Sequence, residues 1–218
     1  MKIAFAEKTE TDIAAFVVDE KGGLPESASA LDVESGGLLS EALGQERFIG
    51  KHGQIAVVVL PKSCSARRAV LIGGGKPGDR DTRAQEKIGA LLVKSQASSG
   101  FKSLALHVDE AGFAARAAIG ATLAAYRFDE FFTKLKDSDK PSLKTFTLVV
   151  PDERAAKAAW KPLSAAAEGT ALARALMNLP PNVLYPQTFA DRIKELEKHG
   201  IEVEILGEKE MEKLGMGA

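Results

Sequence analysis

A glycine-rich segment carries the clearest candidate binding chemistry in the sequence. Gly73, Gly75 and Gly78 follow an apolar run and satisfy the spacing G-x-G-x-x-G. In dinucleotide sites such glycines let the backbone approach a pyrophosphate at the start of a helix. Here Pro77 lies within the loop, and the acidic residue expected about twenty positions later is missing. The three glycines are candidates for a nucleotide site, beside the simpler interpretation of an ordinary glycine turn.

The side chains that catalysis uses most often show no comparable spacing. His52, His107 and His199 are far apart in the sequence, and no HExxH pattern occurs. Cys64 is the only cysteine, which excludes an internal disulfide and zinc sites built from cysteine pairs. Adjacent carboxylates such as Asp109 and Glu110 do not share a helix face, so they form no catalytic pair. We therefore assign no catalytic residue and no metal ligand to these residues.

The charges are balanced in total but segregated along the sequence. Lys and Arg number 29 and Asp and Glu number 30, for a net charge of −1. Residues 1–46 hold three lysines against ten acidic residues, and residues 47–94 hold ten basic residues against three acidic ones. A basic surface attracts phosphates, so the 47–94 stretch and the glycine loop together suggest binding of DNA or an ADP-ribose-type nucleotide. The simpler interpretation is that the two stretches lie side by side and neutralise each other.

The composition is that of an ordinary globular protein. Apolar residues make up 45% and charged residues 27%, which excludes global disorder. No apolar run is long enough to span a membrane, and Met1–Glu7 lacks the apolar core of a signal peptide. With a single cysteine, these features predict a cytoplasmic protein.

Short apolar segments alternate with helical periodicity through the first 150 residues. The runs at 54–60 and 69–72 are continuously apolar, as expected for strands covered on both faces. The alternation predicts an α/β domain with a largely parallel or mixed sheet. The predicted strands are 2–6, 13–18, 54–60, 69–72, 104–108 and 143–150, and the predicted helices are 31–43, 82–95 and 113–128.

The pattern changes after residue 150. Residues 155–177 are rich in helix formers, and Pro162 predicts a kink or break near Lys161. Pro186 predicts the start of another helix, which Gly200 ends. Residues 201–206 alternate apolar and acidic side chains, which predicts a strand exposed on one face, and 208–214 predict a short helix. About forty residues cannot bury much core alone, so a domain boundary is expected between residues 150 and 178.

Several short motifs in the last third of the sequence occur in a recognisable order. They are Asn178, the sequence Pro-Pro-Asn at 180–182, and Leu-Gly-Met-Gly at 214–217. The segments GQERFIGKHGQ (44–54) and GATLAAYRFDEFFT (120–133) precede them. In this order they resemble the leucyl, or cytosol, aminopeptidase family, most strongly over residues 166–218.

The resemblance implies a specific domain organisation. Residues 1–150 would form a macro-like three-layer α/β domain with a mixed sheet, and residues 151–178 a linker helix. Residues 179–218 would form the first helix, strand and helix of a truncated α/β peptidase domain. By the same resemblance, the parent protein would be a homohexamer with its N-terminal domains at the outer corners.

The resemblance also implies a reaction. In the family, two divalent ions, Mn or Zn, activate a water that attacks the peptide bond and releases the N-terminal amino acid. Their ligands lie in an Asp-Thr-Gly-Gly segment and an Asn-Thr-Asp-Ala-Glu-Gly-Arg segment, and neither occurs in these 218 residues. The chain alone is therefore predicted to be inactive and to serve folding and assembly.

Overall fold

The computed structural model describes residues 1–44 and 47–217. Residues 45 and 46, which belong to the family-like segment 44–54, lie outside the described residues, as does residue 218. The chain divides into two compact units, Met1–Ala171 and Leu172–Ala218. Within the described ranges, no helix is long and apolar enough to cross a membrane.

A six-stranded mixed sheet forms the centre of the first unit. Its order is β1-β6-β5-β2-β4-β3. Neighbouring strands are parallel except at one edge, where β3 runs antiparallel to β4. The predicted α/β domain with a mixed sheet is confirmed. The strands are β1 (Lys2–Ala6), β2 (Ile13–Asp19), β3 (Ile55–Val59), β4 (Arg68–Gly75), β5 (Ser103–His107) and β6 (Thr145–Val149).

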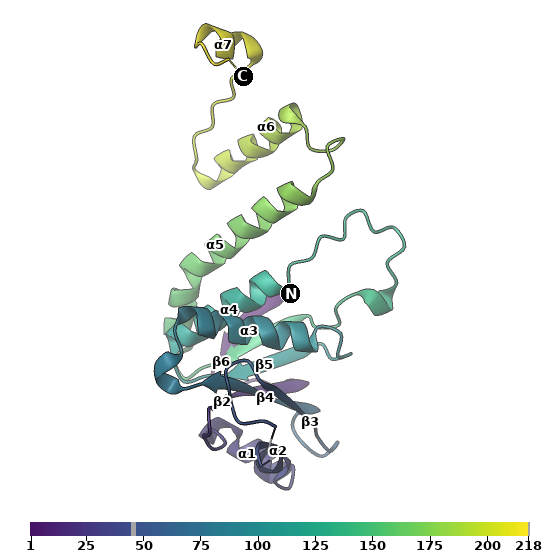
Figure 1. Cartoon of the computed structure of the whole chain (residues 1–218), viewed down its shortest axis with the longest axis vertical. Helices are drawn as coiled ribbons and strands as arrows, with labels where there is room; N and C mark the ends of the chain where they lie inside the picture. Colours follow the sequence, from purple (N-terminus) through teal and green to yellow (C-terminus); the bar gives the residue numbers. More distant parts are fainter. Residues whose placement is uncertain (45–46, 218) are drawn as a thin grey trace. The chain divides into compact units, whose positions relative to one another are not determined.

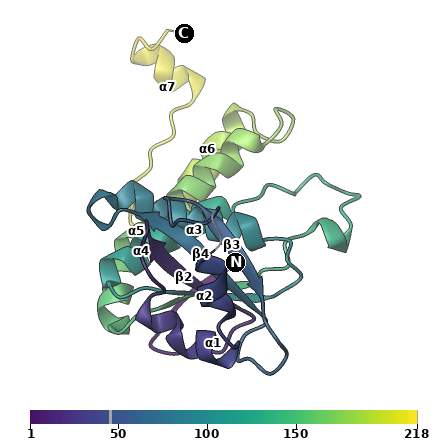
Figure 2. The ribbon, with the colours of Figure 1, turned by 60° about the horizontal axis from the view of Figure 1, so that its bottom comes forward.

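Helices cover both faces of the sheet and make three layers (Figures 1 and 2). On one face lie α1 (Ser29–Glu34) and α2 (Leu38–Leu43). On the other lie α3 (Thr82–Gln96), α4 (Ala111–Ala124) and the first turns of α5 (Glu153–Asn178). Figure 1 shows α3 and α4 above the sheet and α1 and α2 below it. Short 3-10 turns occur at Glu26–Ala28, Pro77–Asp79 and Asp137–Asp139.

Two glycines let α3 and α4 approach closely. A Cβ added at Gly89 of α3 would lie 1.9 Å from the carbonyl oxygen of Ala117. One added at Gly120 of α4 would lie 1.8 Å from the carbonyl oxygen of Glu86. The backbones touch where side chains would normally separate them, because neither position carries a Cβ. Beside this crossing, Arg116 Nη1 pairs with Glu86 Oε1 at 3.0 Å.

One predicted strand forms, but its predicted burial on both faces is wrong. The run at 54–60 does form β3, but β3 lies at the sheet edge, and Val57 and Val59 are 48% and 73% exposed. The run at 69–72 lies within β4 and is fully buried, as predicted. Continuous apolar sequence cannot distinguish an edge strand from a central one, because strand order is set by long-range pairing.

Two helix predictions need correction. The predicted helix at 31–43 is split into α1 and α2, because Gly36 and Gly37 adopt positive φ values of 75° and 90°. The Asp32 carboxylate accepts the Leu39 N–H at 2.9 Å, which starts the second helix. By contrast, α5 continues without a break through Pro162. The alanine-rich turns on both sides tolerate the one missing backbone donor.

The second unit is described by α6 (Pro186–Lys194), a 3-10 turn (Glu195–His199) ended by Gly200, and α7 (Glu208–Lys213). The helix start at Pro186 and the stop at Gly200 are as predicted. The strand predicted at 201–206 does not form, because the described part of this unit offers no partner strand. None of residues 172–217 is buried.

Candidate functional site

The glycine loop was the first candidate, and its backbone is already engaged. Gly73 and Gly75 end β4. The Gly73 N–H donates to the Gln54 carbonyl at 2.8 Å, and the Gly75 N–H donates to the Gly50 carbonyl at 3.0 Å. A Cβ added at Gly73 would lie 2.0 Å from the carbonyl oxygen of Lys51. These two glycines therefore make room for the chain's own loop at 50–54.

The protein also fills the space beside Gly74, whereas Gly78 lies open. Gly78 lies in the 3-10 turn after β4, with nothing within 4 Å of an added Cβ. The guanidinium of Arg80 packs against Gly74, donates to its carbonyl and pairs with the Asp19 carboxylate. Arg80 also lies 5.8 Å from the centre of the Phe113 ring. The Arg80 cation beside Gly74 thus has protein partners on several sides.

The three histidines have separate environments. His107 stacks on Phe16 with ring centres 4.8 Å apart, and burial lowers the pKa of its imidazole. Both ring nitrogens of His52 are buried, with no hydrogen-bond partner in the described structure. His199 is exposed. In residues 1–44 and 47–217, no three or more His, Cys, Asp or Glu side chains are grouped so as to hold a metal ion.

Cys64 is a buried core thiol. It is 6% exposed, and its sulfur lies 3.5 Å from the carbonyl oxygen of Glu34. It packs in the cluster between the sheet and α1 and α2.

Three arginines of the basic stretch 47–94 form hydrogen bonds or ion pairs with neighbouring groups. Arg68 Nη1 donates to Gln96 Oε1 at 2.8 Å and the guanidinium lies over Phe101. Arg67 Nη1 donates to the carbonyl of Lys62. The pair of Arg80 with Asp19 joins this stretch to the acidic one, as the neutralisation interpretation predicts.

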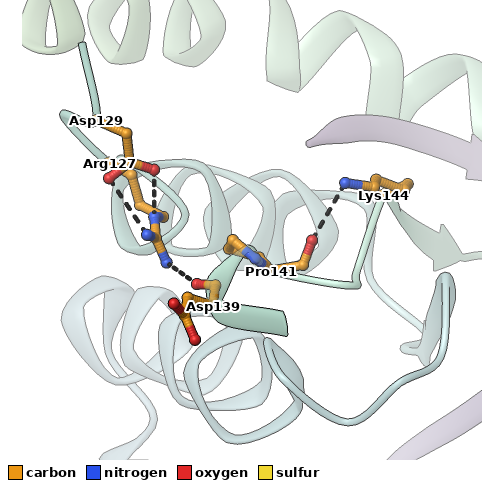
Figure 3. A network of polar contacts seen from close by, with 5 residues as sticks. All are labelled: Arg127, Asp129, Asp139, Pro141 and Lys144. Carbon is orange, nitrogen blue, oxygen red and sulfur yellow. Dashed lines mark hydrogen bonds and ion pairs between the residues drawn. The ribbon is translucent and has the colours of Figure 1, made fainter. Parts of the chain in front are cut away.

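A pocket of about 320 Å³ lies where α3 and α4 end. Figure 3 shows a polar network beside it: the Arg127 guanidinium is forked onto the Asp129 carboxylate at 2.8 and 3.2 Å and donates to the Asp139 carbonyl at 3.3 Å. Lys144 Nζ donates to the Pro141 carbonyl at 3.1 Å. No sequence motif marks this pocket, because its basic side chains, Lys94, Arg127 and Lys144, come from three separate segments.

Comparison with known proteins decides the family. The pattern of the cytosol aminopeptidase family's N-terminal domain matches residues 15–135, and that of its catalytic domain matches residues 171–218. The chain belongs to the cytosol aminopeptidase family. The resemblance inferred from the sequence is thereby confirmed.

Relatives in this family are similar along most of the chain. The probable cytosol aminopeptidase of Caulobacter vibrioides is 40% identical over 209 residues, covering 95% of this chain and 42% of the relative. That of Methylorubrum extorquens is 38% identical over 216 residues, covering 96% of this chain and 43% of the relative. The chain therefore spans less than half the length of these cytosol aminopeptidases.

Solved structures share the fold. A tomato leucine aminopeptidase mutant matches with a TM-score of 0.82 at 22% identity, covering 100% of this chain and 46% of that one. The bottromycin maturation enzyme BotP, in a complex with Mn, matches with a TM-score of 0.70 at 23% identity, covering 94% and 40%. At 22% and 23% identity, this structural similarity establishes the fold alone.

Proposed function

We propose that this chain is the N-terminal part of a metal-dependent aminopeptidase that releases N-terminal amino acids from peptides. The observation that carries the proposal is the match of residues 171–218 to the catalytic domain of the family, which follows the match of residues 15–135 to its N-terminal domain. We assign residues 1–150 to a macro-like N-terminal domain, 151–178 to a linker helix and 179–218 to the beginning of the catalytic domain.

The described residues do not fit the two divalent ions that the family resemblance implies. They hold no group of three or more His, Cys, Asp or Glu side chains suited to a metal ion. The proposal therefore assigns the ligands to other segments of the parent enzyme. There, the bound pair would supply an activated water and polarise the peptide carbonyl. The Mn complex of BotP supports manganese as one of the ions.

The proposed role of this chain is to fold and to support the catalytic part. Residues 172–217 have no buried residue, while Met177, Leu214 and Met216 are 85%, 65% and 57% exposed. Apolar side chains without a core of their own are typical of a segment that packs on further chain. We propose that the rest of the catalytic domain covers them.

Assembly and location follow from the family resemblance. We propose a homohexamer acting on peptides in the cytoplasm, as the name of the cytosol aminopeptidase relatives suggests. Light scattering on the parent enzyme tests the hexamer, and a monomeric active enzyme would contradict it.

One assay tests the proposed function. The purified 218-residue chain is incubated with leucine p-nitroanilide and Mn²⁺ or Zn²⁺, beside a chain extended through a relative's catalytic domain. We expect metal-dependent release of nitroaniline from the extended chain and none from the 218-residue chain. Turnover by the short chain would show that the catalytic machinery lies within it. An inactive but folded, metal-loaded extended chain would contradict the aminopeptidase assignment.

A further inference from the structure

The pocket at the ends of α3 and α4 has an apolar floor. Ala97 and Ala125 are the C-terminal caps of the two helices, and both line the pocket with Val93 and Leu143. Because the cap residues are alanines, no long side chain fills the space between the helix ends. The volume of about 320 Å³ is at the lower end of the range for small-molecule sites.

The rim of the pocket is basic. Lys94, Arg127, Lys144 and the N-terminal residue Met1 line it, and no Asp or Glu is among its lining residues. Lys94 makes no ion pair with any side chain that the structure describes. The Lys144 ammonium donates to a neutral carbonyl, that of Pro141, at 3.1 Å.

A charge balance indicates the sign of the charge that fits the pocket. Two helix C-termini contribute roughly half a negative charge each. Asp129, which does not line the pocket, neutralises Arg127 through a forked ion pair. Two lysines and the Met1 amino group outweigh the roughly one negative charge of the helix ends, so the net charge around the pocket is positive. The local field therefore favours an anion and opposes a cation.

We propose that this pocket binds a small monocarboxylate with an apolar body. The carboxylate lies between Lys94 and Lys144, and the apolar part lies on the alanine floor between α3 and α4. The Arg127–Asp129 pair fixes the loop that closes one side, because Arg127 also holds the Asp139 carbonyl (Figure 3). A free carboxylic acid and the C-terminus of a short peptide share this chemistry.

Titration of the 218-residue chain, followed by backbone amide NMR shifts, tests the proposal. The probes are hexanoate and N-acetyl-leucine, which stand for the two sources, with hexanol, hexylamine and inorganic phosphate as controls. We expect saturable shifts at Ala97, Ala125 and Leu143 with hexanoate, N-acetyl-leucine or both, and the stronger of the two identifies the source. Equal binding of hexanol, hexylamine or phosphate would overturn the proposal, as would shifts confined to other residues.

Matched variants test the charges. Lys94→Gln and Lys144→Gln each remove one rim charge, and we expect each to weaken binding roughly two- to fivefold, the scale of a solvent-exposed ion pair. Lys62→Gln makes the same change at an exposed lysine outside the lining and should leave the affinity unchanged. Ala97→Leu fills the floor and should abolish binding. Unchanged affinity in the folded Lys94→Gln and Lys144→Gln chains would contradict the assigned carboxylate position.

Discussion

Asp12 and Ser103 exchange hydrogen bonds in both directions and thereby join the amino ends of β2 and β5. The Ser103 hydroxyl donates to the Asp12 carboxylate at 2.8 Å and accepts from the Asp12 N–H at 2.8 Å. The same carboxylate accepts the backbone N–H groups of Lys102 and Ser103 at 3.0 and 2.9 Å. The Asp12 carbonyl also accepts the N–H groups of Arg67 and Arg68, so three neighbouring strands meet at this residue.

Asp12→Asn should lower the free energy of unfolding at neutral pH by about 1 kcal/mol, the difference between hydrogen bonds to a charged and to a neutral acceptor. Burial alone would raise the pKa of Asp12, but the hydrogen bonds from Ser103 and from the two backbone N–H groups outweigh it and hold that pKa below 3.8. A depressed carboxyl pKa stabilises the fold above the unfolded value and loses this effect as the pH falls through the folded value.

Urea unfolding at several pH values checks this. The difference between wild type and Asp12→Asn should shrink below about pH 4, because the wild-type carboxylate then becomes protonated. Glu10→Gln is the matched control at an exposed neighbour. A difference that persists unchanged at low pH would show that the charge of Asp12 is not what matters.

His107→Phe should flatten the pH dependence of stability. Burial against Phe16 lowers the pKa of His107 below 6.5, so the unfolded chain binds its proton more readily than the folded one. The wild type therefore loses stability as the pH falls from about 6.5 through the lower folded value. The phenylalanine variant keeps the stacked ring without the titration. Thermal unfolding between about pH 7 and pH 5 measures the effect, with the exposed His199→Gln as control, and parallel curves for wild type and His107→Phe would contradict it.

Gly89→Ala and Gly120→Ala should each destabilise the first unit by about 1–3 kcal/mol, the usual cost of overpacking. Each added methyl group meets a backbone carbonyl at under 2 Å, so α3 and α4 must move apart. Gly169→Ala is the control, since nothing lies within 4 Å of a Cβ there. That change should stabilise α5 by about 0.5–1 kcal/mol, as alanine does within a helix. Denaturant midpoints of the three variants give the comparison, and equal effects at all three positions would exclude the close crossing as the cause.

Limited proteolysis should separate the two units. We expect trypsin or thermolysin to digest the region after Ala171 while residues 1–171 persist, because no residue of 172–217 is buried. Mass spectrometry of the resistant fragment identifies the boundary. In a chain extended through the catalytic domain, the same sites should become protected. A fragment ending near residue 150 would instead place the boundary before α5.

Titration with ADP-ribose should produce no heat. The N–H groups of Gly73 and Gly75, which a pyrophosphate would need, already donate within the protein. Duplex DNA at low salt should likewise produce no saturable signal, since Arg67, Arg68 and Arg80 are engaged by neighbouring groups. Calorimetry measures both, and saturable binding that weakens steeply with added salt would restore the phosphate-binding interpretation.

The sequence predicts secondary structure correctly where local signals, such as capping residues and prolines, decide where an element starts. The helix predicted at 82–95 forms as α3, capped by the Asp81 carboxylate, which accepts the Ala84 N–H at 2.8 Å, and Pro186 begins α6 as predicted. Prediction failed where the outcome depends on distant parts of the chain. The exposure of β3 depends on strand order, and the missing strand at 201–206 depends on a partner.

The candidate sites also differ in whether the sequence reveals them. The glycine spacing at 73–78 was visible in the sequence, but the spacing is the same whether a phosphate or the loop at 50–54 fills the space. The pocket between Lys94, Arg127 and Lys144 was invisible, because folding brings together segments up to about fifty residues apart.

The contact of Gly73 with the loop at 50–51 constrains how this sequence can change over time. A side chain at Gly73 would push the loop away from β4 and break the hydrogen bond between Gly75 and Gly50. Gly50 has its own restriction, a φ of 75° and an added Cβ only 2.3 Å from the Asp19 carbonyl. A larger residue at Gly73 or at Gly50 therefore requires the loop at 50–51 to move relative to β4. Across relatives, the two positions should therefore vary together or not at all.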